Sequence, residues 1–396
     1  MVTVNEAKGR IIANTVTLPA VTMPLAAAVG GFLAEDVVSP IALPPFRQSS
    51  MDGYAIVHSD VTEAGKSLCL AGESKAGQAD LPVVSAGTAV RIFTGAPVPE
   101  GATAVVMQEN TSVANGSVQI HEFPVLEGKN VRRAGQQIAQ GAIALRAGTL
   151  ISPGAVGFLK GINVNEVTVH SKPRIGLLVT GDELLKAGEA LEPGKIYESN
   201  SAMLQAALAL AGMTDVSISY ASDDLDATVD ALCVLLEQCD VILASGGISV
   251  GDYDFVGKAL EVLGAETIFY KVRQKPGKPL LFGKKGEKLI FALPGNPASS
   301  LVCYYEYVLP ALKRIMGSKE PFLRSVRLPL RHAYRFDGER DEFLKARVEG
   351  AEVVSLDGQE SFVIGSFAIA NAIIYLPVAQ NRVEAGELVE VHLLPL

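Results

Sequence analysis

Short apolar runs alternate with helical periodicity through the central part of the chain. Six runs have the length of strands, at residues 174–179, 216–220, 241–244, 267–272, 280–282 and 289–293. The spacing between them predicts helices at 201–211 (capped by Asn200 and ended by Gly212), 225–236 and 255–263. Strands that alternate with helices predict a doubly wound α/β domain with a parallel sheet and right-handed crossovers, which we place at residues 172–317.

The flanking regions have different patterns. Short helices are expected over 5–13 and 25–35, followed by an extended Pro-rich segment that ends near Phe46. Short alternating runs between Gly and Pro turns follow, and β-rich runs return near the C-terminus, which in both places predicts a small β-barrel-like unit. We therefore expect, around the α/β domain, an N-terminal arm domain (1–48 with 145–171), a β-rich domain (49–144) and a C-terminal β-barrel (318–396).

Composition narrows the class of protein. The chain has 396 residues, 48% of them hydrophobic, which is enough for two to four well-buried domains. A net charge of −9 argues against a nucleic-acid partner, because phosphate backbones need a basic face. The four cysteines form no CxxC pair, so we expect a reducing cytoplasm and no structural zinc. No secretory leader and no apolar run of ~18 residues is visible, so no membrane contact is expected.

The segment 240–300 has the features of an anion site. Two strand runs end in glycine loops, Ser245-Gly246-Gly247 and Pro294-Gly295-Asn296-Pro297. Such loops, and the helix start after the second one, present free backbone N–H groups. Three lysines lie between them: Lys271, Lys275 and Lys278. Each loop alone could be a simple connector, but together they favour a site for a multiply charged oxyanion, and Asp252 and Asp254 nearby suggest a divalent cation.

The edge of the predicted sheet gathers further polar residues. Because the carboxyl ends of parallel strands meet at one edge, six residues just past strand ends should share it: Thr180, Glu183, Asp223, Ser245, Asp254 and Pro294. Neither GxGxxG after a strand nor GxxxxGK[ST] is present, so ordinary dinucleotide and P-loop sites are not expected. Asp52 lies in a Met-Asp-Gly turn, a common turn pair that by itself is more often structural than catalytic.

Six motifs together resemble the molybdopterin molybdenumtransferase family, which includes bacterial MoeA and the E domain of gephyrin. They are PPFRQSSMDGYA (44–55), RIFTGAPVP (91–99), TGDEL (180–184), SGGISVGDYD (245–254), KPGKP (275–279) and LPGNPASS (293–300). They recur in order over nearly the whole chain. The resemblance implies an enzyme of molybdenum cofactor biosynthesis that uses Mg²⁺ to insert molybdate into adenylylated molybdopterin and releases AMP.

The resemblance also implies roles for single residues. The implied catalytic residues are Asp52, Glu183, Asp223, Asp254, Lys271 and Lys275, of which Asp52, Glu183 and Asp254 would also bind the metal. The implied substrate-binding residues are Thr94, Arg132, Thr180, Ser245, Gly246, Gly247, Ser249, Gly251, Lys278, Pro294, Gly295, Asn296, Pro297 and Ser366. The lysines and Arg132 would hold the molybdate dianion by charge and by forked hydrogen bonds.

One position departs from the family pattern, and several alternatives stay open. Gln137 stands where many members have an acidic residue, which puts a metal or proton-transfer role there in doubt.

The resemblance further implies a homodimer with composite active sites, and a molybdopterin adenylyltransferase as a partner. The alternatives are a non-catalytic carrier or scaffold for molybdopterin, and a tungstate-inserting paralogue, since the two oxyanions have nearly the same size and charge. Retention of Asp52, Glu183, Asp223 and Asp254 favours the enzyme.

Overall fold

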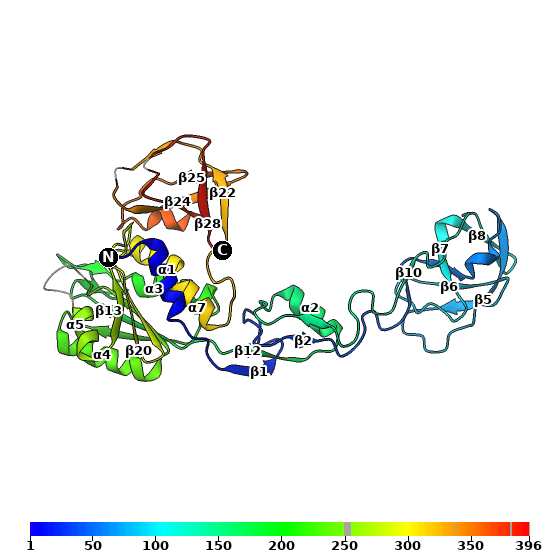
Figure 1. The fold of residues 1–396 in the computed structure, drawn as a ribbon, viewed down its shortest axis with the longest axis horizontal. Helices are drawn as coiled ribbons and strands as arrows, with labels where there is room; N and C mark the ends of the chain where they lie inside the picture. Colours follow the sequence, from blue (N-terminus) through cyan, green and yellow to red (C-terminus); the bar gives the residue numbers. More distant parts are fainter. Residues whose placement is uncertain (249–254, 337, 381, 396) are drawn as a thin grey trace.

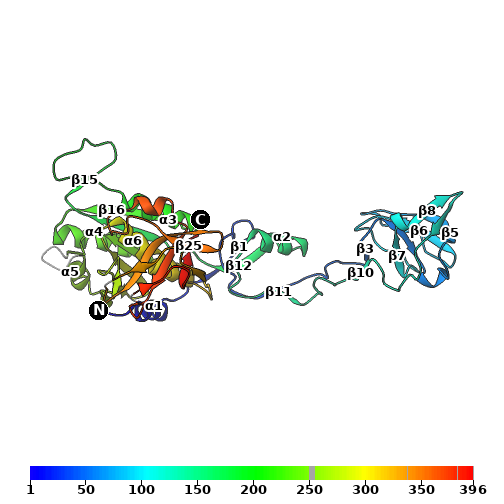
Figure 2. The same ribbon diagram turned by 90° about the horizontal axis from the view of Figure 1, so that it is seen from above.

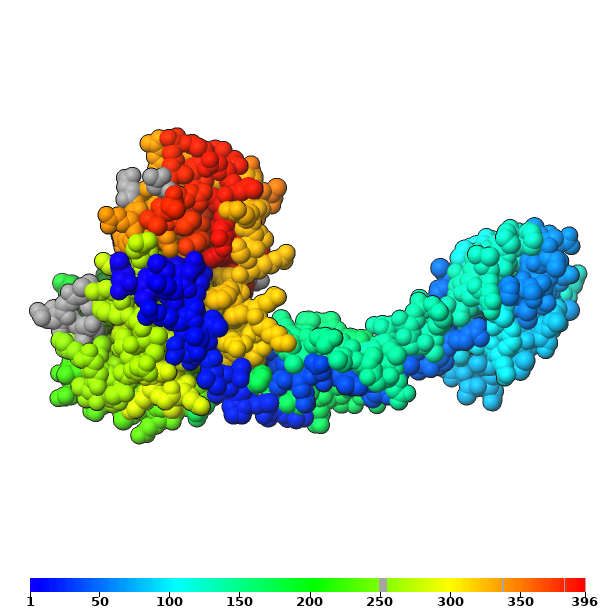
Figure 3. Space-filling view, viewed as in Figure 1, coloured from blue at the N-terminus to red at the C-terminus, as the bar shows by residue number. Residues whose placement is uncertain are grey.

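The molecule is elongated, with a compact head at one end and a small domain at the other. The structure is a computed structural model that describes residues 1–248, 255–336, 338–380 and 382–395. The head contains the α/β domain and the C-terminal β domain, and a narrow arm joins it to a distal β domain (Figures 1 and 3). Four predicted site residues, Ser249, Gly251, Asp252 and Asp254, lie outside the described residues. None of the described helices is long and apolar enough to cross a membrane.

The α/β domain is built on a six-stranded sheet. Its order is β16 (Val216–Ala221), β13 (Ile175–Thr180), β17 (Val241–Ser245), β21 (Lys288–Leu293), β20 (Leu281–Lys285) and β18 (Glu266–Tyr270). The first four strands run parallel, as expected, but β20 is antiparallel to both of its neighbours. The fully parallel sheet is therefore wrong, because the Gly286–Glu287 turn between β20 and β21 is too short for a crossover.

Helices cover both faces of this sheet, which makes the domain doubly wound. One face carries α1 (Val4–Ala13), α3 (Asn200–Leu210), α6 (Pro297–Cys303), the π-helix η3 (Tyr304–Val308) and α7 (Leu309–Ile315). The other carries α4 (Leu225–Gln238) and α5 (Phe255–Val262). Neighbouring residues of β13 show the alternation, because Leu177 packs into the first core and Leu178 into the second.

Two predictions for the N-terminal region differ from the structure. Helix α1 packs into the core of the α/β domain through Val4, Ala7 and Ile11 rather than lying in the arm. The helix expected over 25–35 does not form. Residues 25–30 make turns, Gly30 has a φ of +80°, and the following residues bridge to the second half of the arm. Apolar spacing in this stretch reflects packing against α2 and β12, not a continuous helix.

The arm consists of paired short strands and one helix. β1 (Ala20–Pro24) pairs with β12 (Glu166–His170), and β2 (Val37–Val38) pairs with β11 (Ile143–Leu145). Helix α2 (Pro153–Gly161) packs beside them. Toward the distal domain, β3 (Gln48–Ser49) pairs with β10 (Val131–Arg132). The chain thus runs out along the arm and back, which joins the two sequence segments expected to form this unit.

The distal domain is a six-stranded sheet. Its order is β7 (Ala104–Met107), β4 (Gly53–Ile56), β6 (Thr88–Ile92), β5 (Lys66–Ser74), β9 (Ser117–Ile120) and β8 (Thr111–Ala114). Alternate residues of the central strands enter two apolar clusters, with Ile56 and Ala55 as an example. Short 3-10 turns at His58–Asp60 and Gln108–Asn110 complete the connections.

The C-terminal domain is a sheet that takes one short edge strand, β19, from the segment between β18 and β20 of the α/β domain. Its order is β19 (Gln274–Lys275), β24 (Asp341–Glu349), β26 (Ala372–Leu376), β28 (Leu388–Leu393) and β22 (Ser325–Pro329), with β25 (Glu352–Ser355) also on β24. A bridge from Leu330 to Val353 brings β25 back to the end of β22. β23 (Tyr334–Arg335) pairs with β27 (Arg382–Val383), and η4 (Gly365–Ala368) lies before β26.

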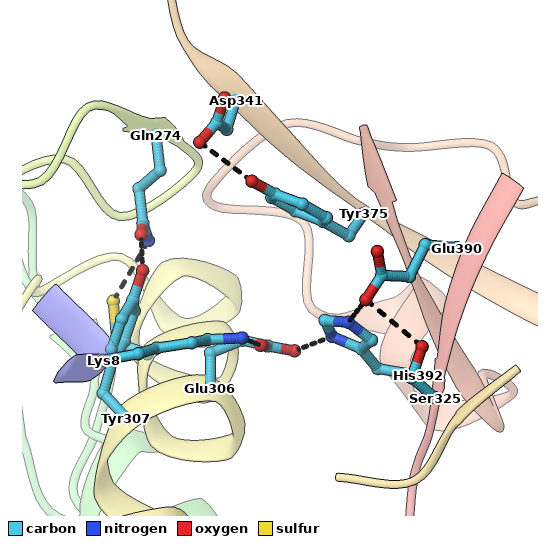
Figure 4. Close-up of polar contacts among 10 residues, drawn as sticks. Lys8, Gln274, Glu306, Tyr307, Ser325, Asp341, Tyr375, Glu390 and His392 are labelled. Atoms are coloured by element: carbon cyan, nitrogen blue, oxygen red, sulfur yellow. Dashed lines mark hydrogen bonds and ion pairs between the residues drawn. The ribbon is translucent and has the colours of Figure 1, made fainter. Parts of the chain in front are cut away.

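A buried ionic cluster joins the two domains of the head (Figure 4). Glu306, on the π-helix, is 2% exposed and contacts Lys8 Nζ at 2.6 Å and His392 Nδ1 at 2.7 Å. His392 also contacts Glu390 at 3.1 Å through Nε2. Burial by itself lowers the pKa of His392, but the hydrogen bond and charge of Glu306 outweigh it and raise the pKa. For Glu306, burial raises the pKa, but the charge of Lys8 and the contact with His392 lower it overall.

We expect the contact between Glu306 and His392 to stabilise the head most between pH 4.5 and pH 6.5. These limits are the ordinary pKa values of a glutamate and a histidine side chain. The raised pKa of His392 gives a contribution that is complete below 6.5 and is lost as the pH rises through the folded value. The lowered pKa of Glu306 gives a contribution that is complete above 4.5 and is lost as the pH falls through its folded value. Chemical denaturation at several pH values tests this. His392→Gln should flatten the alkaline limb, and an alkaline limb that survives this change would contradict the assignment.

Candidate functional site

A cavity of about 520 Å³ opens at the carboxyl ends of the parallel strands of the α/β domain. It is lined by residues that follow β13, β17 and β21, by the segment before α3, and by one residue of the C-terminal domain, Phe362. Predicted site residues in its lining are Thr180, Glu183, Ser245, Gly246, Pro294, Gly295, Asn296 and Pro297. Of the six residues expected to share this edge, Thr180, Glu183, Ser245 and Pro294 line the cavity, Asp223 does not, and Asp254 lies outside the described residues.

Two glycines shape the loop that borders this cavity, and Gly246 lines it. Gly246 has a φ of +90° and Gly247 of +61°, in the region that other residues avoid. A Cβ on Gly246 would lie 2.5 Å from the carbonyl oxygen of Thr180, and one on Gly247 would lie 2.7 Å from its Oγ1. The chain therefore needs glycine here so that the loop can pack against the end of β13 and present its backbone to the cavity.

Asn200 is a residue of this site whose role the sequence did not reveal. We expected it to cap α3, but it is the first residue of that helix, and its side chain crosses to the neighbouring loops instead. Its Nδ2 donates to Ser245 Oγ at 2.9 Å and to Gly295 O at 2.7 Å. It thus ties together the two glycine loops, which lie 50 residues apart in the sequence.

Two buried polar atoms in the cavity lining have no hydrogen-bond partner among the described residues. They are Thr180 Oγ1 and Asn200 Oδ1. An unpaired buried polar atom is unfavourable by about 1–3 kcal/mol, so such atoms usually mark a place where a ligand or water binds. Both atoms therefore support a polar ligand on the cavity floor.

Of the acidic residues around the cavity, Glu183 lines it, whereas Asp223 forms hydrogen bonds with a neighbouring loop. Glu183 lines the cavity and is exposed. Asp223 instead pairs with Asp182, each side chain accepting the backbone N–H of the other at 3.4 and 3.1 Å. Asp224, the next residue, caps α4. Asp223 therefore helps to fix the loops beside the cavity in the structure of the single chain.

The three lysines do not form one cluster. Lys271 has a φ of +69° and its Nζ lies 4.6 Å from the centre of the Tyr270 ring. Lys275 Nζ pairs at 3.0 Å with the buried carboxylate of Glu342. The two residues meet because β19, the strand of Lys275, adds to the C-terminal sheet beside β24. Lys278 lines a separate cleft of about 720 Å³ with Arg273.

This second cleft is cationic and adjoins the first cavity. Besides Arg273 and Lys278 it is lined by Arg340 and by one acidic residue, Glu339. Lys278 lies in this cleft and the next residue, Pro279, lines the first cavity, so one loop separates the two. Neither arginine was predicted from the sequence, because they lie far apart along the chain and carry no motif around them. The cleft has the charge required to bind an oxyanion.

The remaining predicted residues lie elsewhere. In the turn before β4, Asp52 accepts hydrogen bonds from the backbone N–H and hydroxyl of Thr94 at 2.7 and 2.8 Å, and these bonds lower its pKa. Arg132 and Gln137 line a cleft of about 420 Å³ between the arm and the distal domain. Figure 1 shows that β6, β7 and β10 lie at the opposite end of the molecule from β13, whose carboxyl end borders the cavity, and β4 pairs with β6 and β7. A single chain therefore does not bring Asp52 and Glu183 together.

Ser366 Oγ donates to Gly358 O at 3.0 Å and supports a loop beside the cavity rather than lining it. Among the residues that the structure describes, no group of three or more His, Cys, Asp or Glu side chains could hold a metal ion. Asp254, predicted as a ligand, lies outside them. The proposed carboxylates could act as one metal site only if two chains contributed them.

Comparisons with known proteins agree over the whole length. Residues 2–162 match the MoeA N-terminal region (domain I and II), 176–314 a probable molybdopterin binding domain, and 327–394 the MoeA C-terminal region (domain IV). Molybdopterin molybdenumtransferase of Haemophilus influenzae is 33% identical, covering 99% of this chain and 98% of its own. Molybdopterin molybdenumtransferase 2 of Mycobacterium tuberculosis is 35% identical over 94% of each. A crystal structure of the moeA protein from Pyrococcus horikoshii OT3 is 28% identical, with a TM-score of 0.86 over both full chains.

Proposed function

Because the chain belongs to the molybdopterin molybdenumtransferase family and is a transferase of molybdenum cofactor biosynthesis, we propose that it inserts molybdate into adenylylated molybdopterin and releases AMP. The observation that carries this proposal is the polar cavity with its two glycine loops. Glycine loops that follow strands can present backbone N–H groups to phosphate oxygens. The unpaired side-chain atoms of Thr180 and Asn200 suit the polar edge of a pterin or nucleotide.

The cationic cleft is the proposed site for molybdate. Arg273, Lys278 and Arg340 would attract the dianion and hold it near the first cavity, since Lys278 lines the cleft and the next residue, Pro279, lines the cavity. In this arrangement the protein binds and orients both reactants. It also places positive charge where the phosphates carry negative charge, so no nucleophilic side chain is required. A water or molybdate oxygen would attack the pterin-side phosphorus, and AMP would leave with the electrons of the broken phosphoanhydride bond. The dithiolene thiols that bind molybdenum would give their protons to molybdate oxygen, which leaves as water or hydroxide.

Mg²⁺ and a second subunit belong to the same proposal. Carboxylate oxygens are the ligands that Mg²⁺ prefers, and Asp52 and Glu183 are both exposed carboxylates. They would hold the ion together if a homodimer placed the distal domain of one chain over the cavity of the other. The ion would offset the charge of the substrate phosphates. The separation of Asp52 and Glu183 in one chain supports this composite site.

The proposed reaction also implies a partner enzyme. An adenylylated substrate requires an adenylyltransferase that makes it, and we propose that enzyme as the partner of this one.

The four cysteines are free thiols, which supports the cytoplasmic location expected from the sequence.

The direct test is incubation with adenylylated molybdopterin, Mg²⁺ and molybdate. AMP release that depends on molybdate would support the transferase reaction. Tight binding of the pterin without AMP release would instead identify a carrier or scaffold. Repeating the assay with tungstate would show whether the oxyanion site distinguishes the two, which the similar size and charge of the ions make difficult.

Removing Lys278 should weaken molybdate binding about 12- to 160-fold, the loss expected for a hydrogen bond to a charged group. Lys275→Ala is the matched comparison, because the charge of Lys275 is already balanced by Glu342 and its loss should have a smaller effect. Titration of molybdate into each variant, with the pterin substrate present, measures the difference. A larger loss of molybdate affinity in Lys275→Ala than in the Lys278 variant would show that the oxyanion binds beside Lys275 and not in the cationic cleft.

A further inference from the structure

A loop of the C-terminal domain reaches the cavity of the α/β domain in the same chain. Residues 356–363 follow β25, and Ser361 Oγ accepts a hydrogen bond from Asn296 Nδ2 at 2.8 Å. The next residue, Phe362, lines the cavity and is 67% exposed. Single exposed apolar side chains are common on protein surfaces, but this aromatic ring stands at the mouth of a ligand-sized cavity, where a bound ligand would cover it.

A buried lysine holds this loop in place. Lys345, on β24, is 2% exposed, and its ammonium donates to the carbonyl oxygens of Gly358, Glu360 (3.2 Å) and Val363 (2.7 Å). Gln359 adds a pair of bonds with the backbone of Lys345, accepting its N–H at 3.0 Å and donating to its carbonyl at 2.8 Å. The loop on both sides of Phe362 is therefore fixed to the C-terminal sheet, which gives an exposed ring a defined position.

Two other exposed apolar side chains line the same cavity. Ile196 is 58% exposed and Tyr197 is 48% exposed, and both belong to β15 (Ile196–Tyr197), which pairs with β14 (Leu184–Leu185). Figure 2 shows the segment before β15 as a loop that stands out from the α/β domain. The cavity thus has a polar floor at the strand ends and an apolar rim contributed by two separate segments.

We propose that Phe362 is the stacking surface for the flat heteroaromatic ring of the substrate, and that Lys345 is the residue that positions it. The inference rests on the proposed function, because the polar floor is assigned there to the phosphate-bearing part of the substrate. A flat ring bound at the rim would cover the exposed face of Phe362, while the phosphates contact the glycine loops. The substrate offers two such rings, the pterin and the adenine, and they share this chemistry.

The expected size of the effect comes from ring stacking in other systems. Loss of one aromatic side chain that stacks on a base weakens binding by about 5- to 150-fold. Phe362→Leu keeps an apolar side chain but removes the ring, so it should show a loss in this range. Phe362→Trp keeps a ring and should bind at least as well as the unchanged chain.

Tryptophan substitution also supplies a direct readout, because the chain contains no tryptophan. In Phe362→Trp, the single indole should change its fluorescence when a ring stacks on it. AMP and 6-hydroxymethylpterin are the probes, titrated separately, so that the ring responsible is identified by the arm that responds. Leu388→Trp is the control, since Leu388 is 54% exposed at the start of β28 and lines none of the cavities described above. Unchanged emission and unchanged affinity with both probes would overturn the proposal.

The role of Lys345 is tested in the Phe362→Trp chain. Lys345→Met should lower the fluorescence anisotropy of the unliganded indole and weaken probe binding about tenfold, with little change in kcat at saturating substrate, because ground-state and transition-state binding are lost equally. Ser361→Ala, which removes only the bond to Asn296, is the second variant in case Lys345→Met fails to fold. Loss of kcat with unchanged KM would contradict a positioning role. A chain that binds the probes by stacking but releases no AMP would disprove the proposed reaction and leave this inference standing.

Discussion

Mixed dimers that carry Asp52→Asn in one subunit and Glu183→Gln in the other should recover about half of the wild-type AMP release, although each variant alone is inactive. The recovery is expected because a dimer with shared sites would place both substitutions in one site and leave the other intact. The two subunits can be expressed together with different affinity tags and purified in sequence, so that every dimer is mixed. AMP release per dimer is then the measurement.

The physical basis is the length of the molecule. Asp52 is held by Thr94 in the distal domain, whereas Glu183 lines the cavity in the head, with the whole arm between them. The paired strands of the arm and its own apolar core argue against a fold-back that would bring the two ends of one chain together. A second chain is the simplest source of the missing carboxylate.

A reciprocal control makes this experiment decisive. A chain that carries both substitutions, paired with an unchanged chain, should give dimers with almost no activity if the sites are shared, because each site then receives one altered residue. The same dimers should keep about half of the activity if each chain builds its own site. Activity in the control together with none in the first experiment would disprove the composite site.

Replacing Glu306 by alanine should lower the free energy of unfolding of the head by about 3–5 kcal/mol, the usual cost of removing one partner from a buried ion pair. Among the described residues, Glu306 alone contacts both Lys8 on α1 and His392 on β28 in this cluster. Its loss removes the carboxylate that contacts the part-buried ammonium of Lys8 and Nδ1 of the buried His392, and with it a link between the two domains. Urea denaturation, followed by a probe of the C-terminal domain, measures the change.

Glu390→Gln is the matched control for this prediction. Glu390 also contacts His392, at 3.1 Å, but its side chain is 43% exposed. An exposed pair of this kind contributes about 1 kcal/mol or less, so the control should be close to the unchanged chain. Equal losses in the two variants would show that burial of Glu306 is not what makes the cluster stabilising.

Local patterns were sufficient where a structure depends on nearby residues. The strands β13, β17 and β21 were predicted because they are buried on both faces and therefore read as continuous apolar runs. The glycine loops after β17 and β21 were recognised because few residue types suit such turns. The shared edge followed from the parallel order of these strands, which brings their carboxyl ends together.

Contacts between distant segments could not be read in the same way. The expected helix over 25–35 had suitable apolar residues, but these pack against the second half of the arm. Lys275 looked like part of a free cationic cluster until β19 paired with β24 and placed it beside Glu342. Asn200 looked like a helix cap, yet its side chain bridges two loops that only the folded sheet brings near it.

By itself, the sequence determined the membership of the family, the doubly wound domain and the loops that line the cavity, because these depend on short motifs and on local periodicity. Only the tertiary structure decided which charges are free and which are paired, where Arg273 and Arg340 join Lys278, and that Phe362 stands at the mouth of the cavity. It also decided that Asp52 and Glu183 lie apart in one chain. The physical reason is that charge, exposure and distance depend on neighbours from remote parts of the chain, and a linear pattern carries no record of them.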